Sequence, residues 1–297
     1  MNILPEPSEL PQLLEQTPTR PLILVTNDDG IWSPGLKALA EVGLQLGDVI
    51  IAAPAEQQTS MSRAKPRPPT GVLIDDVDIA LDGGIAFSAS SAFGLTKASL
   101  SSYAICASPA LCVIHAVLEL APRKPSLCLS GINYGENIGY SLTASGTIGA
   151  ALEAQAFGIP GLAVSLETPI HLNYSRDYPP LDWRATQFFA HLFAKRMLTT
   201  GLPDGVGLLN LNVPMGATEQ TPVRWTQQSR QNYYTWSASA AGRIVAQPMV
   251  LSSDKVWDMD TLEADSDIRA LAVDRVVSVT PVVRNVTASA NMVAWSA

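Results

Sequence analysis

The sequence is poor in basic residues: Lys and Arg number 19 together, against 27 Asp and Glu, and the formal net charge is −8. Nucleic-acid backbones and anionic membranes are bound mainly through basic side chains, so we expect neither as a partner. No apolar run is long enough to cross a bilayer. Residues 1–20 lack the basic start and the apolar core of a signal peptide, and we therefore expect a cytoplasmic protein.

Cysteine and histidine are scarce as well, with three of each. The cysteines stand in apolar surroundings without metal-ligand spacing, so we expect buried, reduced thiols. His115 is the only polar residue of the apolar run 109–118, which is typical of a histidine in a core, and histidine catalysis is not expected. The cysteines are Cys106, Cys112 and Cys128, and the histidines outside every polar cluster are His171 and His191.

Two common enzyme motifs are missing after the first apolar run, residues 22–25. There is no G-x-G-x-x-G turn, and acidic residues stand where the pyrophosphate of a dinucleotide would lie. An aspartyl-phosphate enzyme needs Asp-x-Asp, but Gly30 follows Asp28 and Asp29. We therefore expect neither a dinucleotide-dependent oxidoreductase nor an aspartyl-phosphate phosphatase.

The chain does contain the alternating apolar runs and helical patterns that are typical of an α/β fold. With 297 residues, 47% of them hydrophobic, it can bury a large core. Residues 71–88 predict a β-hairpin, and short alternating stretches after residue 214 predict further hairpins and an extended tail. We expect strands at 22–25, 49–53, 127–129, 159–166 and 206–213, and helices at 36–42, 109–118, 148–156 and 183–197.

The first strand ends at Asn27-Asp28-Asp29-Gly30, so two carboxylates follow its carboxyl end. Ligands of open α/β sheets bind beyond these ends. Two adjacent carboxylates in a low-dielectric crevice repel each other unless a cation lies between them, which favours a hard divalent cation. The alternative is that both residues merely begin a helix or close a turn, as Asp does before glycine.

The second strand ends at Pro54 and leads into a polar loop, residues 55–63. This loop lies beside the Asp pair if the two strands are neighbours, and its hydroxyl groups are then candidate neutral ligands. An ordinary polar loop is the alternative. The basic cluster at residues 63–69 either steers phosphate to the site or is a solvated loop.

Two further segments suggest anion binding. Residues 130–139 are rich in glycine and asparagine, and glycine lets backbone amides approach an anion closely. Residues 145–147, Ser-Gly-Thr, precede a helix whose first free amides point at whatever lies before it, which favours a phosphate cradle over ordinary capping and close helix packing. The residues expected to contact phosphate are Asn27, Ser60, Gly131, Asn137, Ser145, Gly146 and Thr147.

In this order, the motifs resemble those of the SurE family of metal-dependent nucleotidases over nearly the whole chain. Residues 24–31 with Pro34-Gly35 are similar to the family's opening signature, and Ala53-Pro54 opens its second loop. Residues 130–133 with 135–137, and residues 145–147, are similar to the third and fourth motifs. Residues 209–214 and 277–281 are similar to two structural segments of the family.

The resemblance implies a Rossmann-like three-layer α/β/α sheet with a protruding β-hairpin and a C-terminal oligomerisation tail. It divides the chain into an N-terminal arm at residues 1–20, an α/β catalytic domain at 21–215, and the hairpin and tail at 216–297. It also implies a homodimer or homotetramer with one divalent cation per subunit, Mg²⁺ or Mn²⁺. The implied substrates are small phosphate monoesters, such as nucleoside 5′- and 3′-monophosphates.

Carried over by position, the metal ligands are Asp28, Asp29, Asn133 and Thr59. Thr59 stands five residues after Pro54, where the family has serine, and the neighbouring Ser60 is the alternative hydroxyl ligand. Asp28 and Asp29 are also the expected catalytic residues, with a metal-activated water attacking phosphorus.

A second departure from the family follows this ligand. Residues 62–64 are Ser-Arg-Ala, where many members have Gly-His-Ser, and a proline-rich segment comes next. These differences leave an alternative function open: a divergent metal- and nucleotide-binding protein without turnover.

Overall fold

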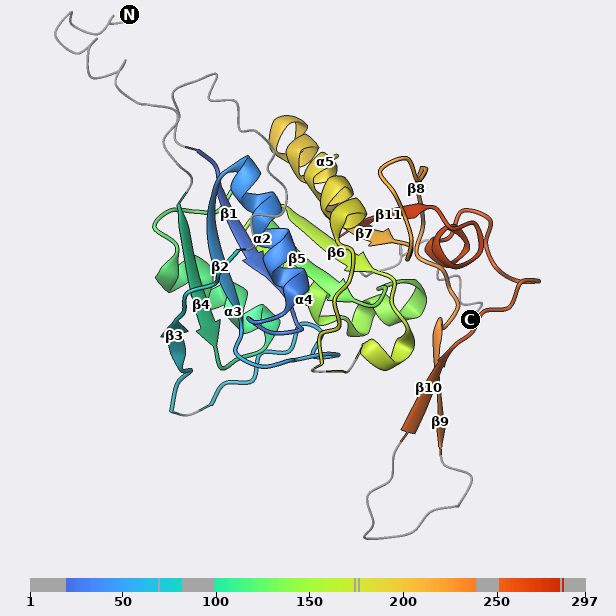
Figure 1. The fold of residues 1–297 in the computed structure, drawn as a ribbon, viewed down its shortest axis with the longest axis horizontal. Helices are drawn as coiled ribbons and strands as arrows, with labels where there is room; N and C mark the ends of the chain where they lie inside the picture. The colour runs from blue at the N-terminus through green and yellow to red at the C-terminus, as the bar shows by residue number, and fades with distance from the viewer. Residues whose placement is uncertain are drawn as a thin grey trace, which may run out of the picture.

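The computed structural model describes residues 20–68, 70–81, 99–173, 175, 177–238, 251–283 and 285. In this part of the chain the strands form a nine-stranded mixed sheet and a separate two-stranded hairpin (Figure 1). The order of strands in the large sheet is β3-β4-β2-β1-β5-β6-β7-β11-β8. The expected α/β fold with a mostly parallel sheet is confirmed.

Neighbouring parallel strands form the centre of the sheet, and β1 is buried at every position, as its apolar sequence predicts. These strands are β4 (Leu100–Ile105), β2 (Asp48–Pro54), β1 (Leu22–Thr26), β5 (Leu127–Tyr134), β6 (Gly161–Leu166) and β7 (Val206–Val213). Antiparallel pairs flank them: β3 (Ile74–Asp76) pairs with β4, and β11 (Val277–Val283) pairs with β7. β8 (Val223–Trp225) is parallel to β11 and lies at the far edge.

Helices cover both faces of the sheet. α2 (Pro34–Leu46) and α5 (Arg184–Thr200) lie side by side on one face, and α3 (Pro109–His115) and α4 (Gly146–Ala156) lie on the other (Figure 1). All four helices lie where the sequence predicts a helix. The short helical turns are η1 (Ala116–Leu120), η2 (Gly139–Ala144), η3 (Ile170–Leu172) and η4 (Arg269–Val273).

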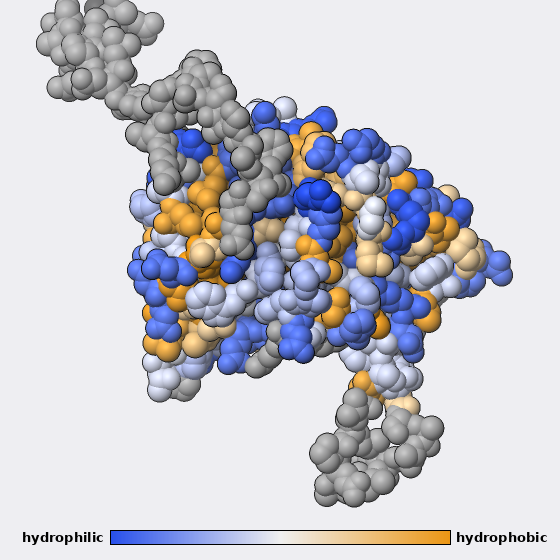
Figure 2. All heavy atoms as spheres, viewed as in Figure 1, coloured by the Kyte–Doolittle hydropathy of each residue, from blue (hydrophilic) through white to orange (hydrophobic). Residues whose placement is uncertain are grey.

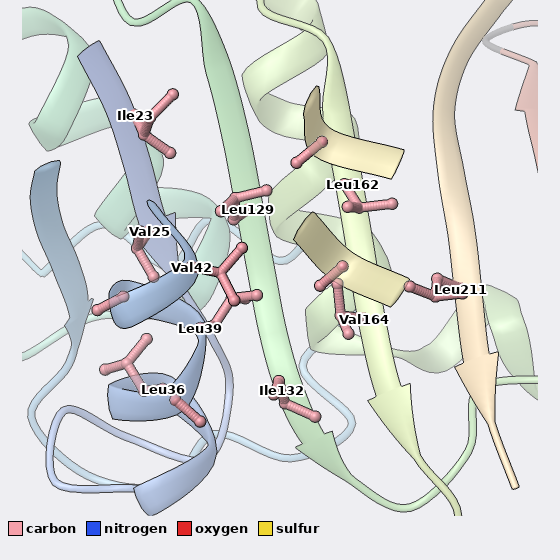
Figure 3. Packing of buried hydrophobic residues seen from close by; sticks show 14 of the residues in the cluster. Ile23, Val25, Leu36, Leu39, Val42, Leu129, Ile132, Leu162, Val164 and Leu211 are labelled. Atoms are coloured by element: carbon pink, nitrogen blue, oxygen red, sulfur yellow. The ribbon is translucent and has the colours of Figure 1, made fainter. Parts of the chain in front are cut away.

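The packing of α2 fixes the position of the loop that precedes it. Leu36, Leu39 and Val42 recur at helical spacing and are almost fully buried. They face residues of the sheet such as Val25 and Leu129 (Figure 3). Burying one such side chain contributes about 1.5–3 kcal/mol, so this face holds α2, and with it the acidic loop after β1, firmly on the sheet.

The side of the molecule that carries α2 and α5 mixes hydrophilic and hydrophobic residues (Figure 2). α5 is the longest helix in the described ranges. Within those ranges, no helix combines the length and the apolar character needed to cross a membrane.

Residues after 215 return to the main sheet through β8 and β11 and also form a projecting hairpin. β9 (Tyr234–Ala238) and β10 (Leu251–Lys255) pair antiparallel and extend away from the body of the molecule (Figure 1). The predicted hairpin is thus confirmed. The division of the chain at residue 215 stays a prediction. The N-terminal arm apart from Arg20, and the residues after Val283 apart from Asn285, lie outside the described residues.

Three elements differ from the sequence-based expectation. β4 was not expected as a strand, although it pairs parallel with β2. β5 was expected to end at Leu129, but it continues to Tyr134, so most of the third motif lies in a buried strand rather than in a loop. Within the predicted hairpin at 71–88, the described strand β3 pairs with β4, which comes later in the chain. The expected second arm at residues 85–87 lies outside the described residues.

Two expectations about single side chains were wrong. His115 is not a core residue: its side chain is 21% exposed, and Nδ1 lies 2.7 Å from Glu119 Oε2 one helical turn away. Cys106 is exposed, because it follows the end of β4, whereas Cys112 and Cys128 are buried free thiols as expected. Burial raises the pKa of Cys128 to about 12, which makes this thiol unreactive.

Asp267 ties the C-terminal segment to the main domain. Its carboxylate accepts hydrogen bonds from the backbone amides of Gly139, Ser229 and Ile268 at 2.8–3.0 Å. We expect Asp267→Ala to lower the free energy of unfolding in urea by about 3 kcal/mol, because it leaves buried donors unpaired. The exposed Asp204 provides the control, and its alanine variant should stay within about 0.5 kcal/mol of wild type. Equal effects of the two substitutions would contradict this role.

Candidate active site

The candidate site lies at the carboxyl ends of β1, β2 and β5. β1 lies between β2 and β5 in the sheet, and the chain passes to the other side of β1 only when it reaches β5. This is the topological switch point of the sheet, where loops on the two sides diverge and leave a crevice. Asp28 and Asp29 follow β1, and Asn133 lies near the end of β5, so these residues flank the switch point.

Asn27 shapes the acidic loop. Its Oδ1 accepts a hydrogen bond from the Gly30 amide at 3.2 Å, and its Nδ2 donates to the Gly30 carbonyl oxygen at 3.0 Å. The side chain is fully buried, and its hydrogen bonds close the turn that carries the two Asp residues. Asn27 thus has a structural role in this turn, and its expected contact with phosphate stays a prediction.

Asp28 is held by the first turn of α4. Thr147 Oγ1 donates to Asp28 Oδ1 at 2.6 Å, and the backbone amides of Gly146 and Thr147 also donate to the carboxylate. Ser145 caps the helix by accepting from the Ile148 amide at 3.2 Å. A side chain at Gly146 would begin 2.6 Å from Asp28 Cβ, so only glycine permits this approach. The expected phosphate cradle of Gly146 and Thr147 is thus directed at a carboxylate of the protein itself.

Asp29 is held from the opposite side. Its Oδ2 accepts from the Tyr134 amide at 3.2 Å, and Gln57 donates to the same carboxyl group. The Tyr178 hydroxyl donates to the Asp29 backbone carbonyl at 2.6 Å. These contacts fix both the backbone and the side chain of Asp29 between the loop after β2 and the end of β5.

Burial disfavours the ionised form of both carboxyl groups. Asp28 is 3% exposed and Asp29 1%. Burial raises the pKa of Asp28 to about 6, despite the hydrogen bond from Thr147. Burial and then the charge of Asp28 raise the pKa of Asp29 well above its usual range. Among the described residues no Lys, Arg or His forms an ion pair with either group.

Two neutral oxygen atoms, which are candidate metal ligands, lie beside the Asp pair. Thr59 Oγ1 is buried and has no hydrogen-bond partner in the described part of the chain. Asn133 Nδ2 donates to the Gly135 carbonyl at 2.7 Å, which leaves its Oδ1 without a donor among the same residues. Asp28, Thr59 and Asn133 line one cavity of about 300 Å³. Asp28, Thr59 and Asn133 thus share one space, whereas Asp29 is not among the residues that line it.

This donor set fits a hard divalent cation. A helix terminus stabilises an anion by about 0.3–2 kcal/mol, whereas burying each charge costs several kcal/mol, so α4 alone does not offset the burial of the pair. Two carboxylates, an amide oxygen and a hydroxyl are ligands that Mg²⁺ and Mn²⁺ accept. In the described ranges no three His, Cys, Asp or Glu side chains come together. The candidate ligands Asp28, Asp29, Thr59 and Asn133 would offer oxygen atoms only, unlike a Cys/His zinc site.

The loop that carries Thr59 is clamped to α4. Glu153 is almost fully buried on this helix, and its Oε2 lies 2.7 Å from Arg63 Nε and 2.8 Å from Lys65 Nζ. A side chain at Gly149 would overlap the Ser62 carbonyl oxygen, so the loop backbone passes directly over the helix. At these two positions the basic cluster anchors the ligand loop, although the Arg63 and Lys65 side chains stay 45% and 36% exposed. A role in steering phosphate stays a prediction.

The structure separates the expected phosphate contacts into groups. Ser60, Asn137 and Ser145 line the cavity together with Asp28, Thr59 and Asn133. Gly131 is buried in β5 at the register shift between Ser130 and Asn133, where a side chain would overlap the Val164 carbonyl oxygen. The roles of all these residues in binding stay predictions.

Several residues of the site carry no signal in the sequence. Tyr178, which holds Asp29, lies in a segment without a motif. Gln57 lies in the polar loop 55–63 and Glu153 in the predicted helix 148–156, but the sequence does not single out either residue. Their partners are far away in the chain, so only the folded structure brings them together.

With this geometry established, comparison with known proteins identifies the family. The model of the family described as "Survival protein SurE" matches residues 23–235, which span β1 to the start of β9. The chain belongs to the SurE family. The expected family resemblance is confirmed.

Individual members of the SurE family match over most of the chain. The 5′-nucleotidase SurE of Methanocella arvoryzae is 35% identical over 277 residues, which cover 90% of this chain and 93% of that protein. The 5′-nucleotidase SurE of Thermococcus gammatolerans is 34% identical over 272 residues, with 90% and 91% covered. The crystal structure of the SurE protein from Aquifex aeolicus superimposes with a TM-score of 0.64 at 25% identity and covers 90% of this chain and 95% of that one.

The raised pKa values predict a pH-dependent response to cations. Because the pKa of Asp28 is about 6 in the fold and about 4 in an unfolded chain, its ionisation destabilises the metal-free protein as the pH rises through this window. A bound divalent cation stabilises the ionised pair. We therefore expect Mn²⁺ to raise the melting temperature little at pH 5 and increasingly from pH 6 to pH 8, measured against EDTA. A shift that is the same at pH 5 and pH 8 would contradict this assignment.

The anchor on α4 predicts an indirect effect on cation binding. We expect Glu153→Gln to weaken Mn²⁺ binding about tenfold by calorimetry, because Arg63 and Lys65 lose the charge that holds the Thr59 loop. Asp48→Asn is the matched control, since it removes the ion pair with Arg123 at the start of β2, at the end of the strand away from the site. Equal Mn²⁺ affinity in wild type and Glu153→Gln would show that the loop does not depend on this anchor.

Proposed function

We propose that this protein is a divalent-metal-dependent phosphomonoesterase that hydrolyses nucleoside 5′- or 3′-monophosphates to nucleoside and phosphate. The observation that carries the proposal is the pair of buried carboxylates, which has no basic partner in the described part of the chain. Beside it lies the buried Thr59 hydroxyl, which is unpaired among the same residues. Two relatives in the family are named 5′-nucleotidase SurE, which supports nucleoside monophosphates as the substrate class.

The residues of the chain have distinct roles in this proposal. Asp28, Asp29, Asn133 and Thr59 would hold the cation, Mg²⁺ or Mn²⁺, through oxygen atoms. Ser60 lies next to Thr59 on the cavity wall and is the alternative hydroxyl. Ser60, Asn137 and Ser145 lie where they can orient the phosphate by hydrogen bonds, and Gly146 and Thr147 keep Asp28 ionised and in place.

Orientation alone is insufficient for this reaction. Enzymes accelerate the hydrolysis of phosphate monoesters by up to ~10²¹, and each factor of ten in rate requires a reduction of the activation free energy by about 1.36 kcal/mol. One hydrogen bond to a charged group contributes only about 1.5–3 kcal/mol. When bound, the cation would polarise the phosphoryl group and lower the pKa of a water molecule. Asp28 and Asp29 then act as the carboxylates that fix this charge in a buried, water-poor crevice.

The second candidate function is binding of metal and nucleotide without turnover. It is favoured by the departures from the family pattern, Thr59 for serine and Arg63 in the following segment. In the structure both residues are integrated into the site, because Thr59 lines the cavity and Arg63 pairs with Glu153. This integration favours an intact enzyme site.

Two further parts of the proposal concern the whole molecule. The projecting β9–β10 hairpin supports a homodimer or homotetramer, because such elements commonly pair subunits (Figure 1). A cytoplasmic location remains the expectation from composition.

Phosphate release from AMP tests the function. We expect turnover with Mg²⁺ or Mn²⁺ that stops with EDTA, and loss of turnover in Asp29→Asn, which keeps the shape of the side chain but removes its charge. Circular dichroism of the variant should match that of wild type, and Asp204→Asn serves as an exposed control with unchanged turnover. Activity that is indifferent to EDTA, or near-normal in Asp29→Asn, would refute the proposal. Tight nucleotide binding without phosphate release under any divalent ion would favour the second candidate.

A further inference from the structure

The cavity beside the Asp pair also has an aromatic end. Asp28 at its inner end is 3% exposed, whereas Tyr140 and Trp236 are 61% and 58% exposed. The cavity therefore runs from a buried acidic end to an open aromatic end at the base of the β9–β10 hairpin. The aromatic residues that line it are Tyr134, Tyr140, Tyr233, Tyr234 and Trp236.

One face of the hairpin forms a wall of this open end. Tyr234 pairs with Lys255 and Trp236 pairs with Ser253 across the two strands. Every second side chain of a strand points to the same face, so these two pairs share one face of the hairpin. The first pair fastens this face to the α/β domain: the Tyr234 hydroxyl donates to the Glu136 carbonyl at 3.2 Å, and Lys255 Nζ lies 2.5 Å from Glu136 Oε1. The second pair, Trp236 and Ser253, stands one step further along and lines the cavity.

Tyr140 lies on another wall, in η2 directly after the third motif. Its backbone amide donates to the Gln231 carbonyl at 3.0 Å, which fixes η2 against the segment leading into β9. Asn232 follows Gln231 and lines the cavity with an exposed amide side chain. The open end thus combines flat apolar surfaces with a neutral group that donates and accepts hydrogen bonds.

The charges around the cavity favour an uncharged group at this end. Of the described residues that line it, only Asp28 and Glu136 are charged, and none is Lys or Arg. The Glu136 side chain is fully buried and is neutralised by Lys255. Among the described residues that line the cavity, a second phosphate group would find no cation, whereas a planar heterocycle would find aromatic faces and an amide.

We propose that Trp236 and Tyr140 bind the base of a nucleoside monophosphate whose phosphate lies at the Asp pair. This inference rests on the proposed function, which places the phosphate. Stacking of the base at the hairpin would then make nucleotides better substrates than simple phosphate esters. Substrates with a second phosphate group at the open end of the cavity would be disfavoured.

The test compares kcat/KM for AMP with kcat/KM for ribose 5-phosphate, which has the same sugar and phosphate but no base. In Trp236→Ala and Tyr140→Ala we expect the ratio of the two values to fall at least about tenfold, the range that loss of one base–aromatic stack produces. Trp236→Phe should restore most of the ratio, because it keeps an aromatic face. Trp225→Ala is the matched control: Trp225 is 56% exposed but lies on β8 in a different groove, and the ratio should stay that of wild type.

Each outcome decides a different question. An unchanged ratio in both alanine variants would overturn the base site while the phosphomonoesterase stands. If wild type hydrolyses neither substrate, the proposed function fails, and calorimetric titration with adenosine then decides the base site. Weaker adenosine binding by Trp236→Ala than by Trp225→Ala would support the site, and equal binding would overturn it.

Discussion

The burial of two adjacent carboxylates is the constraint on which the site depends. Asp28 and Asp29 are almost inaccessible and have no cationic side chain beside them in the described structure. Their mutual repulsion and lost hydration disfavour the ionised pair unless positive charge is supplied from outside the chain. The surrounding elements accordingly present hydrogen-bond donors to the carboxylates and leave neutral oxygen atoms, on Thr59 and Asn133, facing the same cavity.

α4 organises two of the loops that meet there. Its first turn binds the Asp28 carboxylate, and two turns later Glu153 holds the loop that carries Thr59. Because both contacts belong to one rigid helix on the sheet, the distance between the acidic loop and the hydroxyl loop is set by the helix. Gly146 and Gly149 make the close approach of both loops possible.

Local patterns revealed most central strands, the helices and the Asp pair, because apolar periodicity and adjacent carboxylates are visible over a few residues. They did not reveal β4, whose apolar residues are interrupted by two serines. They did not reveal what each polar group binds. The first turn of α4 was expected to face phosphate, but Thr147 bonds Asp28, which is 119 residues away in the chain. The basic cluster finds its partner in Glu153, 90 residues from Arg63. The prediction that His115 lies in the core was wrong because the apolar run around it is longer than the buried face of the helix. The His115 ring lies at the border of that face.

The position of β11 has a consequence for how the protein is made. This strand lies between β7 and β8, although β7 precedes it by more than sixty residues in the chain. Until β11 leaves the ribosome, the nascent sheet exposes the hydrogen-bonding edge of β7, a hydrophobic strand that invites pairing with other chains. Synthesis of the hairpin region therefore prolongs the interval in which a chaperone would have to cover that edge.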